Sequence, residues 1–327
     1  MMMTPVFRSL AAAALAAGVS FLAPVIGHAQ SSGAAACPPA AVPLDPDRFQ
    51  AGMSQARDHG FLWRIVKDGR TSYLYGTLHA AQPAWMFPGP RTTAAFEGSD
   101  VLALELDLLD ADIRERLIKA ATARPDERLP AALVARLEKR MAAECVDPAA
   151  MRNLVPEFQI ASLAVLAARR DGLDPSYAID LVLAVIARDF GKATTSLETA
   201  EAQIAALRMP TREGTIEFVT SGLDELDAGR SAPLLAHMAS AWVDGNLADL
   251  EGYERWCDCL NTAAERASMK RLVDDRNPVL AAAIDKVHAG GRSVFAAVGS
   301  LHMIGARGLP ALLRQRGYVV EQVPFGR

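Results

Sequence analysis

Two histidines stand in the same short sequence context in two distant parts of the chain. His79 ends the segment GTLH, and His302 ends the segment GSLH. Each segment follows an apolar run that is typical of a buried strand, and its glycine permits the sharp turn at which such a strand ends. Ligands of open α/β folds bind at the carboxyl ends of strands, where a neutral imidazole suits Zn, Mn, Fe or Co. One such histidine is more often a structural residue, but two in the same context favour a shared site.

Acidic side chains follow two further predicted strands. Glu105 and Asp107 lie in VLALELD, where the alternation of a strand would place both on one face. A carboxylate in such an apolar run needs a metal ion or an arginine as its partner if it is buried. For Asp107, an ordinary carboxylate at the surface is as good an interpretation as a buried one with a partner. For Glu105 the surface interpretation is less favoured. Glu198, in TTSLETAEAQ, repeats the pattern, although capping of the next helix would also explain it.

Arg276 and Asn277 lie in LVDDRNPVL, between two predicted helices. Arg276 could pair with Glu105 or orient a substrate carbonyl group, although a surface arginine that balances neighbouring aspartates is the more common situation. The motifs GxSxG, GxxxxGK[ST] and HExxH do not occur, so a serine hydrolase or a nucleotide-binding protein has no motif to support it. The other histidines of the mature chain lack a partner motif and are predicted to be structural or exposed: His59, His237 and His288.

The elements that would position these residues change in type along the chain. Residues 61–79 contain two β-rich runs around the turn KDGR, which predicts a hairpin. Further strands are predicted at 101–107, near 194, at 293–298 and at 318–325, and helical spacing of apolar residues dominates between them. The predicted fold class is α/β, with a central mixed sheet formed by the N- and C-terminal segments and a large helical insertion at about 111–190.

The first 29 residues have the layout of a secretory signal peptide. Arg8 precedes an apolar stretch, and small residues stand at a cleavage site after Ala29. An uncleaved anchor is less favoured because the stretch is rich in alanine and contains Gly18 and Pro24. Residues 30–50 predict an extended leader, and residues 51–327 predict the folded domain. No later stretch is long and apolar enough to span a membrane, so the predicted location is periplasmic or secreted.

The charge of the chain limits its partners. Loss of the signal peptide removes the charge of Arg8 and changes the formal net charge from −4 to −5. A mildly acidic chain without a basic cluster argues against nucleic acid or an anionic membrane surface as partner. The chemistry of the strand-end residues is therefore the better guide to function.

Four cysteines predict two structural disulfides in an exported protein, because that compartment is oxidising. The three possible pairings of Cys37, Cys145, Cys257 and Cys259 stay open. A bond between Cys257 and Cys259 is sterically the least attractive, since a single residue separates them. A zinc site at WCDC is less favoured because neither a second cysteine pair nor a nearby histidine supports it.

Five segments together resemble the TraB/GumN family: YLYGTLH, LALELD, LETAEAQ, RNPVLAAAI and FAAVGSLHMIGARGLPALLRQRGYVVEQV. They follow the family's order from about residue 60 to residue 323. The family includes the Tiki proteins, which look like metal-dependent proteases that act on secreted peptides. The resemblance implies a fold related to the erythromycin-esterase and ChaN-like group.

The resemblance also implies a metal centre built from His79, His302 and Glu105, with Arg276 and Asn277 as supporting residues. Mn or Co is suggested by the likeness to the Tiki proteins, and Zn is chemically reasonable. Asp180 departs from the pattern, because relatives often have a glycine before it and this chain reads YAID. Asp180 and Glu198 are therefore expected only to position the ligands.

The predicted function is an exported metal-dependent hydrolase that cleaves peptide bonds. The metal would polarise the scissile carbonyl and lower the pKa of its bound water to about 7. Glu105 would be the third ligand or the general base, and Arg276 would stabilise the developing oxyanion. Two alternatives remain: a ChaN-like protein that binds haem or iron without turnover, and a non-catalytic accessory factor for polysaccharide export.

Overall fold

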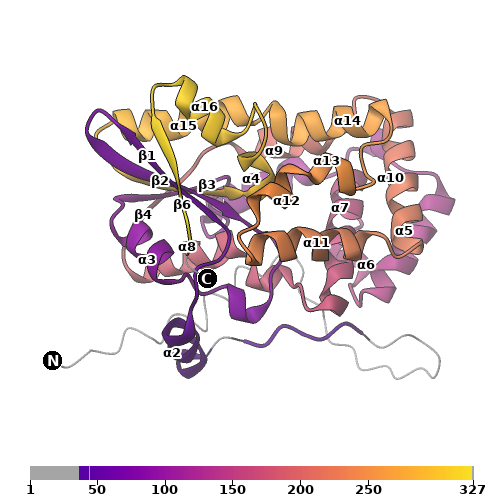
Figure 1. Cartoon of the computed structure of the whole chain (residues 1–327). Helices are drawn as coiled ribbons and strands as arrows, with labels where there is room; N and C mark the ends of the chain where they lie inside the picture. Colours follow the sequence, from indigo (N-terminus) through magenta and orange to yellow (C-terminus); the bar gives the residue numbers. More distant parts are fainter. Residues whose placement is uncertain (1–36, 44, 326–327) are drawn as a thin grey trace.

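The computed structural model describes residues 37–43 and 45–325, so the predicted signal peptide and the first residues of the predicted leader lie outside the described residues. Within those ranges, six strands form one sheet in the order β4-β3-β5-β2-β1-β6 (Figure 1). Their bounds are β1 Phe61–Lys67, β2 Arg70–Thr77, β3 Val101–Leu104, β4 Ala193–Ser196, β5 Val294–Gly299 and β6 Val319–Val323.

Four neighbouring strands of this sheet run in parallel. β4 pairs with β3, β3 with β5, and β5 with β2, all in parallel, while β1 is antiparallel to both β2 and β6. β3 and β5 are buried along their whole length, which explains why VLAL and VFAAVG read as continuous small and apolar runs. The predicted mixed sheet of N- and C-terminal segments is confirmed.

The predicted hairpin is also confirmed, and its turn explains the KDGR sequence. β1 and β2 pair from Phe61 with Gly76 to Lys67 with Arg70. Asp68 and Gly69 between them have φ angles of 51° and 73°. Positive φ at both central residues is what a two-residue type I′ turn requires, and Asp-Gly supplies it at little cost.

Helices fill the chain between and around the strands. Their bounds are α2 Pro46–Gln55, α3 Pro90–Glu97, α4 Ala111–Ala121, α5 Ala131–Ala143, α6 Pro148–Met151, α7 Pro156–Ala167, α8 Ile179–Asp189, α9 Ala200–Leu207, α10 Arg212–Asp227, α11 Ser231–Val243, α12 Leu247–Glu251, α13 Tyr253–Trp256, α14 Ala263–Met269, α15 Asn277–Ala289 and α16 Leu309–Gln315. The predicted helical insertion therefore corresponds to α4–α8, and a second run of helices follows β4.

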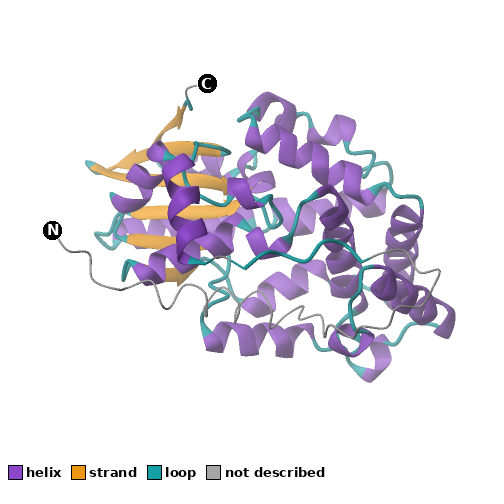
Figure 2. Ribbon diagram, turned by 90° about the horizontal axis from the view of Figure 1, so that it is seen from below, coloured by secondary structure: helices purple, strands orange, loops and turns teal. Residues whose placement is uncertain are grey.

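The helices build two regions. α3 and α8 cover one face of the sheet and α15 and α16 the other, while α5, α7 and α10 pack together beside the sheet (Figures 1 and 2). This second region has its own apolar core, which includes Leu137, Met151, Leu163 and Leu223. Trp242 of α11 is fully buried and donates a hydrogen bond from Nε1 to the Gly76 carbonyl at 2.7 Å, so it ties the helices to the end of β2.

The extended-leader prediction is wrong over its last residues. α2 begins at Pro46, inside the predicted leader, and the Asp45 side chain caps it by accepting a hydrogen bond from the Arg48 amide at 2.8 Å. An aspartate followed by proline is a strong start signal for a helix, and here it outweighs the Pro/Ala-rich composition before it.

Both disulfides of the chain lie within the described residues. Cys37 is bonded to Cys145 and Cys257 to Cys259, and none of the four cysteines is free. The expectation that Cys257 and Cys259 would be the least attractive pair was wrong. Asp258 between them has a φ of 48°, and this left-handed turn brings the two Cα atoms to 5.1 Å, within the range that a disulfide spans.

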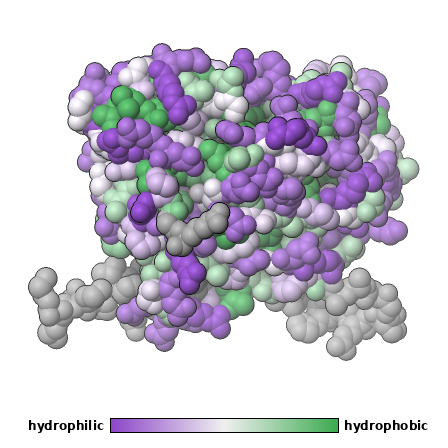
Figure 3. Space-filling model, viewed as in Figure 1, coloured by the Kyte–Doolittle hydropathy of each residue, from purple (hydrophilic) through white to green (hydrophobic). Residues whose placement is uncertain are grey.

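The surface view in Figure 3 is mainly hydrophilic, with small separated hydrophobic areas. Within residues 37–43 and 45–325, no helix combines the length and the apolar character that crossing a bilayer requires.

Candidate functional site

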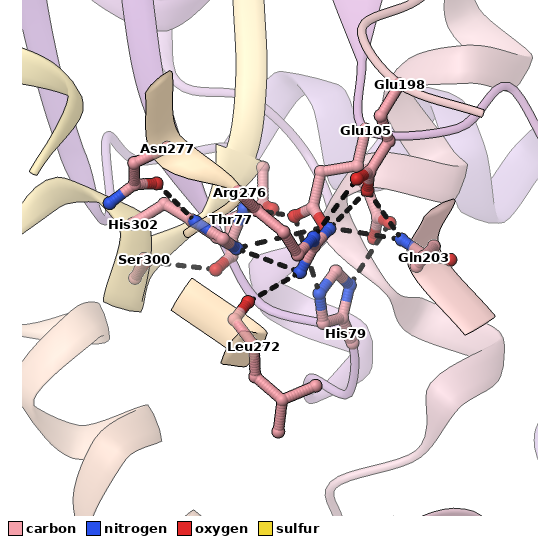
Figure 4. Close-up of polar contacts among 12 residues, drawn as sticks. Thr77, His79, Glu105, Glu198, Gln203, Leu272, Arg276, Asn277, Ser300 and His302 are labelled. Carbon is pink, nitrogen blue, oxygen red and sulfur yellow. Dashed lines mark hydrogen bonds and ion pairs between the residues drawn. The ribbon is translucent and has the colours of Figure 1, made fainter. Parts of the chain in front are cut away.

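The carboxyl ends of the four parallel strands bring the predicted residues to one edge of the sheet. Glu105 follows β3 directly, and His79 and Glu198 stand two residues after β2 and β4. His302 lies in the 3-10 turn Ser300–Met303 (η6), immediately after β5. Figure 4 shows these side chains converging on Arg276. The sequence prediction that distant strand ends form one cluster agrees with this arrangement.

The two GxxH segments pack directly against each other. β2 and β5 are neighbours, with Thr77 opposite Gly299, and the Ser300 hydroxyl donates to the Thr77 carbonyl at 2.9 Å. A Cβ on Gly76 would lie 2.9 Å from Ser300 Oγ, so the glycine of the first segment makes room for the second. The repeated glycine is thus explained by close approach of two parallel strand ends.

The glycine of the second segment makes room for the site itself. A Cβ on Gly299 would lie 3.2 Å from Glu105 Oε1, 3.3 Å from His79 Nε2 and 3.7 Å from His302 Cδ2. The Gly299 amide also donates a hydrogen bond to Glu105 Oε1 at 2.8 Å. The two histidines and the glutamate therefore surround one small space beside this backbone.

His79 is the accessible member of the cluster. Its Nδ1 lies 3.2 Å from Asp180 Oδ2 and its Nε2 lies 3.8 Å from Glu105 Oε1, and 57% of the side chain is exposed. The Asp180 charge raises the pKa of His79 to about 9, against the opposing effect of desolvation and with further help from Glu105. Asp180 is placed by the first turn of α8, whose first amide donates to the Leu78 carbonyl at 2.9 Å.

His302 is buried and holds a defined tautomer. Asn277 Nδ2 donates to the Arg307 carbonyl at 2.8 Å, so Asn277 Oδ1 faces His302 Nδ1 at 2.6 Å and accepts a hydrogen bond from its N–H. His302 Nε2 is then an acceptor, 3.3 Å from Arg276 Nη1 and 4.0 Å from Glu105 Oε2. Burial lowers the pKa of His302 to about 4, so the ring is neutral at pH 7.

Arg276 forms the centre of the polar contacts. It donates to Glu105 and Glu198, with its Nε 3.1 Å from Glu198 Oε2, and its Nη1 donates to the Leu272 carbonyl at 2.9 Å. Leu272 belongs to the π-helical turn Lys270–Asp274 (η5), which precedes α15. Only 13% of the Arg276 side chain is exposed, so its interpretation as a surface arginine was wrong.

The two glutamates respond differently to this environment. Burial acts to raise the pKa of Glu105, but His302, His79, Arg276 and the Gly299 amide together hold it well below its usual range. Burial raises the pKa of Glu198 in spite of its bonds to Arg276. Glu105 is thus a fixed carboxylate at neutral pH, as a metal ligand or a counter-ion must be.

The chemistry of the donors suits a divalent metal ion. Each histidine uses Nδ1 for a side-chain partner, Asp180 or Asn277, and turns Nε2 towards Glu105. Metal-binding histidines almost always have such a partner on the other ring nitrogen. Two imidazoles and one carboxylate are ligands that Zn, Mn and Co accept.

Arg276 stands where such an ion would bind. In the part of the chain that the structure describes, no three His, Cys, Asp or Glu side chains are grouped closely enough to hold a metal as they lie. Arg276 already donates to Glu105 Oε2 and contacts His302 Nε2, the atoms that an ion would use. The residues would fit a metal held by His79, Glu105 and His302 once Arg276 gives up its contact with His302 Nε2 and shares or gives up Glu105 Oε2.

Asp107 is placed away from this cluster, and neither its strand assignment nor its surface interpretation holds. β3 ends at Leu104, so Glu105 and Asp107 both follow the strand and take separate partners. Asp107 is 5% exposed, lies 3.0 Å from two nitrogens of Arg188, and accepts a hydrogen bond from Thr194 at 2.6 Å. Asp107 therefore joins β4 and α8 and is structural.

Sequence reasoning gave Gln203 no role, although it contacts both glutamates. Its Nε2 lies 3.2 Å from Glu198 Oε1 and 3.4 Å from Glu105 Oε2. Thr199 caps α9 by accepting from the Ala202 amide. Gln203 stands one helical turn after that cap, and this spacing is the signal that could have placed it at the strand edge.

The remaining histidines lie outside the cluster, as expected. His59 contacts the Val243 carbonyl, and His237 pairs with Asp249 and stacks on Trp256. His288 is buried between Ser72 and the Lys67 carbonyl. These contacts are structural.

Comparison with known proteins agrees with the resemblance of the five sequence segments. No curated protein and no solved structure matches the chain. The model of the TraB/PrgY/gumN family matches residues 61–322, which include every strand-end residue of the site and most of the sheet. This protein belongs to the TraB/PrgY/gumN family.

Proposed function

We propose that this protein is an exported, metal-dependent hydrolase that cleaves peptide bonds. The observation that carries the proposal is the shared orientation of the two histidines. His79 and His302 come from different strand ends, each is held at Nδ1, and both present Nε2 to Glu105 at 3.8 and 4.0 Å. If each histidine had only a structural role, there would be no reason for both Nε2 atoms to face the same carboxylate, Glu105.

His79, His302 and Glu105 would hold the ion, which we expect to be Mn, Co or Zn. When bound, it supplies Lewis-acid chemistry: it polarises a carbonyl group and makes a bound water acidic. Glu105 is better suited to be a ligand than a mobile base, because both of its oxygens already accept hydrogen bonds, from Gly299 and from Arg276. Asp180 and Asn277 keep the two imidazole rings in place.

Arg276 would act on the substrate. Its Nη1 points at the space between His302 and Leu272, so once it leaves His302 it can donate to the oxygen of a scissile carbonyl. A donor that is positioned where negative charge develops stabilises that charge and lowers the barrier. Glu198 holds the other side of the guanidinium and keeps it oriented.

Access and location agree with this role. The exposed side of His79 opens the cluster to solvent, so a substrate can approach without unfolding of the sheet. The signal-peptide pattern at residues 1–29 and the bond between Cys37 and Cys145 support export. The choice of a peptide substrate depends on the resemblance to the Tiki proteins.

The test measures metal content and peptide hydrolysis together. Wild type, His79→Ala, His302→Ala and the control His237→Ala are purified under metal-replete conditions. We expect about one transition-metal ion per chain in wild type and in His237→Ala, and loss of both metal and activity in the other two variants, with unchanged circular dichroism. Absence of stoichiometric metal from the wild type would overturn the proposal.

A further inference from the structure

A second reactive feature lies outside the sheet edge, where Cys257 and Cys259 are bonded across a single residue at the end of α13. We propose that this disulfide is a thiol–disulfide exchange site for dithiols, and that only the bond between Cys37 and Cys145 is a permanent structural link. The inference is independent of the metal site, since no residue is shared.

The two disulfides constrain the chain to different extents. Cys37 and Cys145 are 108 residues apart, whereas Cys257 and Cys259 are two apart. The entropy that a cross-link removes from the unfolded chain grows with the length of the closed loop. The short loop therefore contributes little stability, and its opening costs the fold much less than opening of the long loop.

The backbone within the short loop also favours opening. Asp258 has a φ of 48°, in the left-handed region that residues other than glycine rarely adopt. Reduction frees this residue to leave the left-handed region. Cys145 of the long-loop disulfide is also left-handed, with a φ of 54°, so the loop lengths, and not this backbone cost, distinguish the two bonds.

Access to the disulfide is through a cavity of about 320 Å³. Both cysteines border it, together with Leu234, Trp256, Arg230 and His237. Cys259 is partly exposed, whereas Cys257 is 7% exposed. An incoming thiolate therefore meets Cys259 Sγ first, in a space whose walls also include the acidic residues Glu225 and Asp258.

The hydrogen bonds at the two sulfurs support this direction of attack. The Cys259 amide donates to Cys257 Sγ at 3.2 Å, so Cys257 is stabilised as the leaving thiolate. Tyr253 Oη lies 3.2 Å from Cys259 Sγ, and burial raises the pKa of Tyr253 to about 12, which keeps its hydroxyl a donor at neutral pH. The backbone donor thus lies at the sulfur that leaves, and the tyrosine hydroxyl lies at the sulfur that is attacked.

The exchange balances with a dithiol as the only co-reactant. One of its thiolates attacks Cys259 Sγ, the bond between the two protein sulfurs breaks, and the electron pair leaves on Cys257. The second thiolate of the dithiol then attacks the dithiol sulfur that is bonded to Cys259 in the mixed disulfide. This closes the disulfide of the dithiol and releases Cys259 as a thiolate. The dithiol is oxidised to a disulfide, the protein pair is reduced, and the two thiol protons of the dithiol end on the two cysteines.

The first experiment equilibrates the full mature chain in glutathione buffers of increasing reducing strength, followed by alkylation and peptide mass mapping. We expect Cys257 and Cys259 to become alkylated in buffers in which the bond between Cys37 and Cys145 is still intact. The proposal is overturned if the two disulfides are reduced together, or if the bond between Cys257 and Cys259 is the more resistant one.

The second experiment measures transfer of oxidation to a reduced peptide that carries two cysteines. Oxidised wild type is expected to form up to one peptide disulfide per chain, and the double variant Cys257→Ser with Cys259→Ser to form none. Tyr253→Phe should slow the reaction several-fold without changing the long-loop disulfide. Equal peptide oxidation by wild type and the double variant would place the reaction elsewhere and contradict the proposal.

Discussion

Arg276 donates a hydrogen bond to Glu105 although 171 residues separate them in the sequence. The contact joins the start of α15 to the end of β3, and Glu198 accepts from the same guanidinium. A buried arginine between two carboxylates holds the strand edge together, and in this protein it also occupies the atoms that a metal ion would need. Under the proposed function, we therefore expect Arg276 to stabilise the metal-free fold and to oppose metal binding.

Replacement of Arg276 separates these two effects. Arg276→Gln leaves Glu105 and Glu198 buried without their cation, so we expect the free energy of unfolding of the metal-free protein to fall by about 3–5 kcal/mol. Because the competing cation is gone, added Mn or Zn should stabilise the variant more than the wild type. Denaturant unfolding with a chelator and with metal measures both quantities. A smaller metal-induced gain in the variant would show that Arg276 does not compete with the ion.

Replacement of Asp180 shifts the titration of His79. The pKa of His79 is about 9 instead of 6.5, mainly because of the Asp180 charge, so in the metal-free protein the charged ring stabilises the fold. A raised pKa gives a contribution that is complete below pH 6.5 and lost as the pH rises through about 9. In Asp180→Asn the pKa should fall towards 6.5, and the loss of stability should move to lower pH.

Titration of the His79 ring by NMR in the presence of a chelator, beside unfolding curves across the same pH range, measures this shift. The stability difference will be modest, since more than half of the side chain is exposed and solvent screens the charge. An unchanged His79 pKa in Asp180→Asn would mean that Asp180 does not hold this ring.

A methyl group at Gly299 tests the space between the ligands. Gly299 has φ −49° and ψ 139°, which alanine adopts freely, so Gly299→Ala should change the unfolding free energy by less than about 1 kcal/mol. Its Cβ would stand 3.2 Å from Glu105 Oε1 and 3.3 Å from His79 Nε2, and we expect metal affinity to fall at least about tenfold. Isothermal titration measures the affinity.

Gly290→Ala is the matched control, because Gly290 follows the end of α15 opposite to Arg276 and Asn277, and its Cβ would meet only backbone carbonyls of that helix. It should bind metal as the wild type does. Unaltered affinity in Gly299→Ala would show that the ion, if bound, does not lie beside this glycine.

Much of the sheet and the cluster could be predicted from the sequence, because both depend on local signals. Asp68-Gly69 marks the hairpin turn, and the two GxxH segments mark parallel strand ends. Strand ends that share an edge must bring His79, His302 and Glu105 together, whatever lies between them in the chain. The α/β class and the helical insertion followed from periodicity alone.

Other features depend on contacts that periodicity does not encode. Whether Asp107 is a surface residue is decided by Arg188, which reaches it from α8, far along the chain. The burial of Arg276 depends on a π-helical turn whose sequence carries no distinctive pattern. The pairing of Cys257 with Cys259 depends on one left-handed residue, and an aspartate gives only a weak indication of that conformation.

The most direct measurement compares two carboxylates that stand two residues apart. Glu105 lies in the cluster, whereas Asp107 pairs with Arg188 and Thr194. Metal content and affinity are determined for Glu105→Gln and Asp107→Asn, beside the wild type, by elemental analysis and isothermal titration. We predict one ion per chain in the wild type and in Asp107→Asn, which should only lose about 1–3 kcal/mol of stability, and none in Glu105→Gln. Full metal binding by Glu105→Gln would contradict a metal centre at this sheet edge.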